Sequence, residues 1–178
     1  MNRHAPLLLL LGFLMAVTSA EAIITRTYSF RIKIPDIKMM RILRNNLPGG
    51  IIDLQLYANE AGRPVEISNS AVDNNTWLQL TSIAPQDENR KVAVQITSGN
   101  VPLGTLLMLS ASDCDTGDGA RGTTHPISNL SKSTAQTLID GIGSCYTGTT
   151  STSGYNLTYT WMPDPANIEK MVAFSSYQ

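Results

Sequence analysis

Charged residues are scarce in this sequence. Only 15 % of its 178 residues are Asp, Glu, Lys or Arg, and the formal net charge is −1. A nucleic-acid-binding protein carries a basic surface, so this composition argues against that class. It is equally atypical of a cytosolic enzyme. With 42 % hydrophobic residues and many Ser, Thr, Asn and Gly, the sequence is typical of an extracellular β-protein.

Long apolar runs are also missing, except at the N-terminus. The run from Pro6 to Val17 follows Arg3 and His4, and Ala20 and Ala22 occupy the last two small positions of an A-x-A cleavage site. This pattern predicts a secretory signal peptide cleaved after the twenty-second residue. The run is too short to span about 30 Å of hydrocarbon, so we expect no transmembrane segment in the mature chain. The protein is expected to be secreted, periplasmic or displayed on the cell surface.

The chain has only two cysteines, Cys114 and Cys145. In an oxidising compartment they allow one pairing, and we predict a structural disulfide between them. Closing a loop of about 32 residues is expected to stabilise the fold by about 3–4 kcal/mol. The alternatives are two free buried thiols or a metal site that uses both sulfurs.

Histidine is nearly absent, and no catalytic constellation stands out. His125 is the only histidine after cleavage, which excludes a site of several histidine ligands. A Ser-His-Asp arrangement is formally open, but no G-x-S-x-G motif accompanies it. We interpret His125 as a solvated loop residue and expect a protein without enzymatic activity or cofactor.

Alternating apolar residues predict several β-strands. The clearest is Ile24–Ile34, in which nearly every even position is apolar and every odd position is polar, ended by Pro35. Further strands are expected at 52–56, 77–83, 91–97, 103–111 and 155–161. The stretch at 103–111 is apolar on both faces, which favours a central position in its sheet.

Four segments stay ambiguous. Ile37–Leu43 fits a strand or a helix, and Ser133–Ile142 fits a helical turn or a strand. Ile127–Leu130 is a candidate for one more short strand. The tail Pro165–Gln178 is expected to be a short helix capped by Asp164, or a late edge strand. No long amphipathic helix is visible, so residues 23–178 are predicted to form one all-β, Ig-like or Greek-key sandwich of seven to nine strands.

Two groups of residues are candidates for a binding site. Asp113, Asp115 and Asp118 lie among glycines and could chelate Ca²⁺, although the spacing departs from the EF-hand pattern and a tight turn explains it better. Four aromatic residues could form a sugar-stacking platform, but alternation places most of them on the core side of a strand. These residues are Trp77, Tyr155, Tyr159 and Trp161.

Charge is unevenly distributed along the chain. Residues 26–44 carry six basic side chains against Asp36, whereas residues 45–178 carry six basic and twelve acidic ones. The first strand, Ile24–Ile34, is therefore amphipathic and opposite in sign to the remaining body. It either pairs within its own sheet, which the expected strand count favours, or is lent to another subunit or envelope protein.

Several stretches resemble a group of uncharacterised secreted β-sandwich proteins of Gram-negative bacteria. They are Ile32–Ile37, Arg90–Ile96, Val101–Leu107, Leu138–Gly148 and Gly154–Tyr159. The resemblance implies export and a β-sandwich in the cell envelope, but no activity and no catalytic residues.

A second resemblance is to the subunits of chaperone–usher fimbriae, which are exported Ig-like sandwiches with an amphipathic N-terminal donor strand. Ile24–Ile34 is comparable to that strand, and Tyr177 matches a common penultimate aromatic residue. The late position of the cysteines departs from the fimbrial pattern. We therefore expect a structural or adhesive protein of the cell envelope, with a fimbria-like subunit as one form of it and a secreted glycan-binding module as the alternative.

Overall fold

The computed structural model describes residues 29–45, 47–48, 50–58, 60–63, 65 and 71–173. The chain divides into two units, Met1–Ile34 and Pro35–Gln178. In the first unit, residues 29–34 form no regular secondary structure. The predicted strand is therefore not found over these six residues. Its earlier part and the predicted signal peptide lie outside the described residues.

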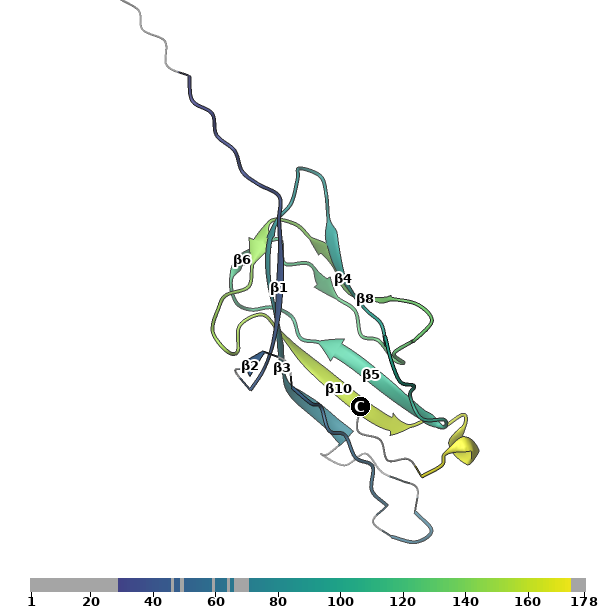
Figure 1. Ribbon diagram of the computed structural model, residues 1–178. Helices are drawn as coiled ribbons and strands as arrows, with labels where there is room; N and C mark the ends of the chain where they lie inside the picture. The colour runs from purple at the N-terminus through teal and green to yellow at the C-terminus, as the bar shows by residue number, and fades with distance from the viewer. Residues whose placement is uncertain are drawn as a thin grey trace, which may run out of the picture. The chain divides into compact units, whose positions relative to one another are not determined.

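The second unit contains two antiparallel sheets (Figure 1). The larger sheet has the order β2-β1-β3-β10-β5, and a short β6–β9 pair joins it at the end of β3. The smaller sheet has the order β4-β8-β7. The bounds of the larger sheet are β1 Ile37–Arg44, β2 Leu47–Pro48, β3 Val72–Ile83, β5 Thr105–Ala111, β6 Asp118–Gly119, β9 Cys145–Tyr146 and β10 Tyr155–Pro163. Those of the smaller sheet are β4 Arg90–Val94, β7 Thr123–Thr124 and β8 Gln136–Ile142.

The predicted all-β sandwich is confirmed. The described residues hold ten strands rather than seven to nine, because four of them pair over only two residues. The neighbours β3 and β10 are far apart in sequence, which is typical of Greek-key connections. The expected C-terminal helix is a single 3-10 turn, Ile168–Lys170, and Asp164 accepts a hydrogen bond from the Ala166 amide just before it.

Two ambiguous segments and one expected strand are now settled. Both Ile37–Leu43 and most of Ser133–Ile142 are strands, β1 and β8. The strand expected at 52–56 is wrong, since these residues belong to no strand although their burial alternates. Alternation there marks which side chains are partly covered, without a partner strand to form a ladder. Ile127–Leu130 contributes one bridge, between Ile127 and Leu109.

The central position expected for the strand at 103–111 is also wrong. Among the described strands, β5 ends the larger sheet, and beyond it lies only the Ile127 bridge. Leu109 is buried, while Leu106 and Met108 on the opposite face are half-buried. Partial cover on the outer face is thus enough to explain the apolar residues of this strand.

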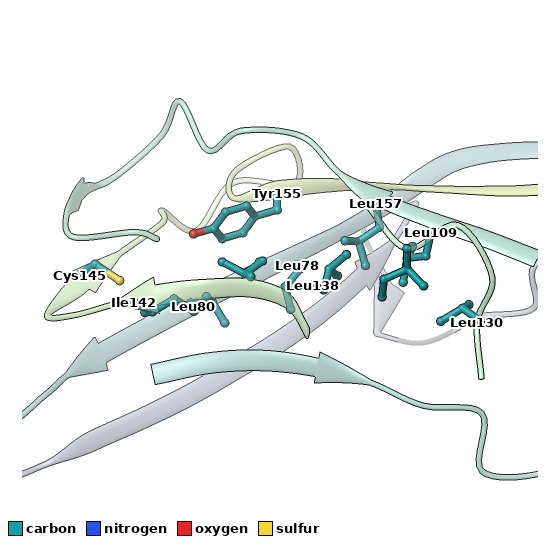
Figure 2. Close-up of a cluster of buried hydrophobic side chains, with 11 residues drawn as sticks. Leu78, Leu80, Leu109, Leu130, Leu138, Ile142, Cys145, Tyr155 and Leu157 are labelled. Atoms are coloured by element: carbon teal, nitrogen blue, oxygen red, sulfur yellow. The ribbon is translucent and has the colours of Figure 1, made fainter. Parts of the chain in front are cut away.

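The core lies between the two sheets (Figure 2). The larger sheet contributes Leu78 and Leu80 from β3, Leu109 from β5, and Tyr155 and Leu157 from β10. The smaller sheet contributes Leu138, Ile139 and Ile142, all from β8. Full burial of one such side chain stabilises a fold by about 1.5–3 kcal/mol, so these residues hold the sheets together.

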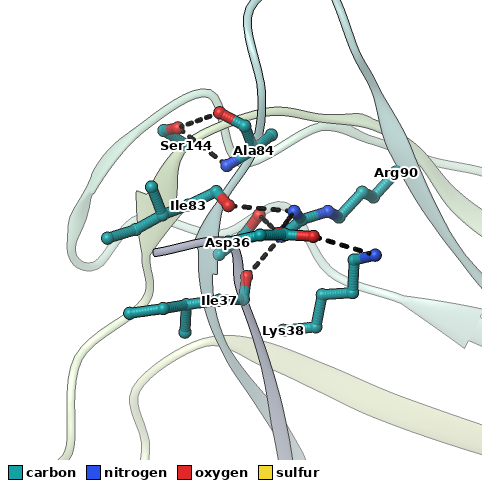
Figure 3. A network of polar contacts seen from close by, with 8 residues as sticks. Asp36, Ile37, Lys38, Ile83, Ala84, Arg90 and Ser144 are labelled. Atoms are coloured by element: carbon teal, nitrogen blue, oxygen red, sulfur yellow. Dashed lines mark hydrogen bonds and ion pairs between the residues drawn. The ribbon is translucent and has the colours of Figure 1, made fainter. Parts of the chain in front are cut away.

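Arg90, the first residue of β4, ties the smaller sheet to the larger one (Figure 3). Its Nη1 donates to the Ser82 hydroxyl at 2.8 Å and to the Ile37 carbonyl oxygen. Its Nη2 donates to the Ile83 carbonyl oxygen at 2.9 Å and to the Asp36 carboxylate. The planar guanidinium thus joins the start of β1 and the end of β3 to β4.

A second ion pair connects the other ends of β1 and β3. Arg44 Nη2 lies 2.7 Å from Asp73 Oδ2, and the second nitrogen faces the other carboxylate oxygen. Asn75 also donates to this carboxylate, from its main-chain nitrogen at 3.3 Å and from its side-chain Nδ2 at 3.2 Å. The guanidinium of Arg44 holds the pKa of Asp73 below its usual value.

Replacing Arg90 by Lys is predicted to lower the free energy of unfolding by about 1.5–3 kcal/mol. Lysine keeps the charge but has no planar fork, so at least one main-chain carbonyl loses its donor. Urea unfolding followed by circular dichroism measures the change. The control is Lys91→Ala at the exposed neighbouring position, which is expected to stay within about 0.5 kcal/mol of the unmodified protein. Equal losses in the two variants would contradict this role of Arg90.

The Asp73 pair predicts a loss of stability in acid. Because the pKa of Asp73 is lowered in the folded state, its contribution is present at neutral pH and disappears as the pH falls through that lowered pKa. Asp73→Asn is expected to be less stable than the unmodified protein at pH 7, with the difference shrinking toward pH 2. Urea midpoints measured across this range test the prediction. A difference that stays constant with pH would refute it.

Candidate functional site

The free edge of β1 is the candidate interaction surface. β1 pairs with β3 along its whole length, from Ile37 opposite Ile83 to Arg44 opposite Thr76. On its other side, only Leu43 and Arg44 pair with β2. Within the part of the chain that the structure describes, residues 37–42 therefore present an unpaired strand edge. Such an edge is a template for another strand.

The side chains along this edge are unusually apolar for an exposed strand. Met39 is 65 % exposed, Met40 is 61 % exposed and Ile42 is 42 % exposed. Met40 lies opposite Leu80 and Ile42 opposite Leu78, so both point to the core side of the sheet. Their exposure means that the smaller sheet does not cover β1. The core is thus incompletely closed along this strand.

Residues 30–34 carry exposed apolar side chains that alternate with basic ones. Phe30, Ile32 and Ile34 are 88 %, 86 % and 72 % exposed, and they alternate with exposed Arg31 and Lys33. In an extended conformation, the three apolar side chains lie on one face and the two basic ones on the other. The segment has the side-chain pattern of a half-buried strand, but residues 29–34 pair with none.

Both cysteines are free thiols in this structure, in contrast to the predicted disulfide. Cys145 is buried in the core, and Cys114 packs against the same cluster. Burial raises the pKa of the Cys145 thiol, and the nearby Cys114 raises it further. The fold therefore brings the two sulfurs into one neighbourhood, and the disulfide remains a prediction.

The Asp/Gly loop does not assemble the three carboxylates of the calcium hypothesis. The side chain of Asp118 accepts a hydrogen bond from the Gly119 amide at 2.7 Å, and Asp113 accepts one from the Thr124 hydroxyl at 3.3 Å. Among the described residues, no group of three or more His, Cys, Asp or Glu side chains could hold a metal ion. Asp113 and Asp115 line a cleft on the outer face of the larger sheet, whereas Asp118 does not.

Gly117 explains the shape of this loop. Its φ of +76° is in the left-handed region, and a Cβ there would collide with the carbonyl oxygen of Tyr146. The glycine thus lets the loop approach β9 closely, which is the tight-turn interpretation of the sequence.

His125 has an acidic partner. Its Nε2 lies 3.0 Å from Asp140 Oδ1, and both side chains are about half exposed, at 47 % and 53 %. The main-chain amide of His125 donates to the Leu138 carbonyl oxygen, which holds the loop against β8. Among the described contacts, no serine hydroxyl bonds to this imidazole.

The four aromatic residues do not form one exposed platform. Tyr155 is 1 % exposed and belongs to the core, and its hydroxyl donates to the Arg121 carbonyl oxygen. Burial raises the pKa of Tyr155 and of Tyr159. Trp161 is half-buried, and its Nε1 is buried without a partner among the described residues. Trp77 differs from Tyr155 and Tyr159, because its side chain points away from the core.

No family model matches this chain, and neither the curated proteins nor the solved structures provide a match. The two resemblances inferred from the sequence therefore stay predictions. In the described part of the chain, no helix is long and apolar enough to cross a membrane.

We predict that Cys114 and Cys145 form a disulfide when the protein is exported to an oxidising compartment. The exported protein should weigh two hydrogen atoms less than the reduced protein by intact mass spectrometry. Reduction should lower the free energy of unfolding by about 3–4 kcal/mol. The matched control is Cys114→Ser, whose stability should not respond to the reductant. Alkylation of both thiols in unreduced, denatured protein would contradict the disulfide.

Proposed function

We propose that this protein is an exported, non-enzymatic subunit of the cell envelope that assembles with further copies of itself. The observation that carries the proposal is the unpaired apolar edge of β1 in a chain that also has an exposed, amphipathic N-terminal segment. In this proposal, residues 30–34 of one copy pair as an added strand with β1 of the next copy. Such head-to-tail pairing extends into a polymer when the arrangement does not close.

Main-chain hydrogen bonds and apolar burial would both favour this contact. An added strand satisfies the unpaired amide and carbonyl groups of residues 37–42. If Phe30, Ile32 and Ile34 face the core side, they cover Met40 and Ile42. Each well-buried apolar side chain contributes about 1.5–3 kcal/mol relative to its exposed state.

Charge does not drive the contact at short range. Lys38 and Arg41 of β1 carry the same sign as Arg31 and Lys33 of the added segment. Pairing must therefore rest on burial and strand hydrogen bonds. The net acidic charge of residues 45–178 supplies the longer-range attraction for the basic segment.

The proposal predicts polymers that survive SDS until the sample is boiled. Envelope extracts of cells expressing the full chain should give a ladder without boiling and a single monomer band after boiling. Ile32→Asp should abolish the ladder, because it places a charge on the face that becomes buried. Met40→Lys should abolish it from the acceptor side.

Leu103→Asp is the matched control, because Leu103 is also well exposed, at 69 %, and lies outside both proposed surfaces. It should leave the ladder intact. Circular dichroism of purified monomers checks that all three variants are folded. A monomer band without boiling in the unmodified protein, or a ladder that persists in Ile32→Asp, would refute the proposed assembly.

A further inference from the structure

A polar cleft of about 870 Å³ lies on the outer face of the larger sheet. Its floor is formed by β3 and β10, and its walls by the loop after β5 and the loop before β10. Among the residues that the structure describes, the lining includes four asparagines, two aspartates and one tryptophan, and no lysine or arginine. None of these residues belongs to the free edge of β1 or to the N-terminal segment.

Trp77 is the aromatic residue of the cleft. On β3 it lies next to Leu78, which points into the core, so Trp77 points to the opposite, outer face. Across the sheet it faces Leu43 on β1 and Asn156 on β10. Leu43 is buried at 6 % exposure, while Trp77 is half-buried. The indole is therefore supported on one side by an aliphatic neighbour and partly open to the cleft.

The loop before β10 is held firmly against the sheet. The side-chain amide of Gln79, itself 5 % exposed, donates to the carbonyl oxygens of Thr150 at 2.6 Å and Ser153 at 3.3 Å. Arg41 donates to the other end of the Gln79 amide at 3.0 Å. This wall is thus preorganised, since its main chain is fixed by a buried side chain.

The opposite wall is held in the same way. Ser112 and Asn156 exchange main-chain and side-chain hydrogen bonds at 2.9 Å, which ties the loop after β5 to β10. The Thr116 hydroxyl donates to the Thr147 carbonyl oxygen at 2.6 Å and accepts from the Gly154 amide at 2.8 Å. Gly154 has a φ of +93°, and a Cβ there would collide with the Leu78 carbonyl oxygen, so only glycine permits this approach.

Several polar side chains in the cleft remain available for a ligand. Within the described residues, the side chains of Asn74, Asp115, Ser151 and Thr152 make no hydrogen bond. An amide both donates and accepts, a carboxylate accepts, and a hydroxyl does either. This set matches the hydroxyl groups of a saccharide, each of which also donates and accepts. The face of an indole covers the apolar face of a sugar ring.

The charge of the cleft narrows the class of ligand. The described lining holds two carboxylates and no basic side chain, which disfavours a phosphate, a sulfate or an acidic sugar. Single-stranded nucleic acid is disfavoured for the same reason, because its backbone needs cationic partners. We infer that this cleft binds a neutral saccharide, with one sugar ring against Trp77 and its hydroxyls bonded to Asn74 and Asp115. This inference is independent of the proposed assembly and gives the subunit an adhesive surface.

Tryptophan fluorescence offers a direct test, because the chain has only two tryptophans. In a Trp161→Phe background, Trp77 is the only tryptophan and reports on the cleft. This protein is titrated with chitotriose, mannotriose and N-acetyllactosamine as neutral probes, and with sialyllactose as an acidic probe. At least one neutral probe should change the emission in a saturable manner, and sialyllactose should bind more weakly than the best neutral probe. Calorimetry with the unmodified protein should give the same affinity.

Two variants and a control test the location. Asn74→Ala and Asp115→Ala should each weaken binding of the best probe by about tenfold, which corresponds to about 1.4 kcal/mol. Asp118→Ala removes an exposed carboxylate from the same loop but outside the cleft, and it should bind normally. Trp77→Ala should abolish binding. Trp77→Tyr should keep part of the affinity, because it retains an aromatic face for the sugar ring.

Three outcomes would overturn the inference. The first is that no neutral probe gives a saturable change at millimolar concentration. The second is that Asp118→Ala weakens binding as much as Asp115→Ala does, and the third is preference for the acidic probe. None of these results depends on polymers, since binding is measured on folded monomer, so failure here is distinct from failure of the proposed assembly.

Discussion

The guanidinium of Arg90 is the contact on which the arrangement of the two sheets depends. It is largely buried, with a side chain 15 % exposed, and it donates hydrogen bonds to main-chain carbonyl oxygens at the start of β1 and the end of β3. A buried cation is costly unless hydrogen bonds and an opposite charge compensate it, and here Asp36 and Ser82 do so. Because Arg90 begins β4 of the smaller sheet and all of these partners lie in or next to β1 and β3 of the larger sheet, satisfying Arg90 requires β4 to lie beside the β1–β3 pair (Figure 3).

The smaller sheet is too narrow to cover the larger one completely. β8 fills the middle of the core with Leu138, Ile139 and Ile142, and β1 is left with Met40 and Ile42 exposed on the core side. The outer face carries a different surface, in which two polar loops surround Trp77 and Gln79 holds the loop before β10. The proposed strand-pairing edge and the proposed saccharide cleft thus use different residues of one copy.

Much of the sheet could be predicted from the sequence, because alternation reports burial on one face of a strand. The alternation at 155–161 predicts that Tyr155 lies on the core side of its strand, and this residue is buried. The same alternation gave a wrong prediction at 52–56, where side chains alternate in burial but no strand pairs with these residues. Apolar residues on both faces also failed to predict that β5 ends its sheet, since pairing partners lie far away in sequence.

By itself, the sequence determined an all-β chain with one core and little charge, because strand periodicity and composition are local properties. Only the tertiary structure decided which edge stays unpaired, since that depends on how many strands the second sheet supplies. It also decided the partners of the candidate residues. Asp113 and Asp115 line one cleft with Trp77, and Asp118 lies outside it. Such groupings join residues from distant strands and loops, and no local pattern encodes them.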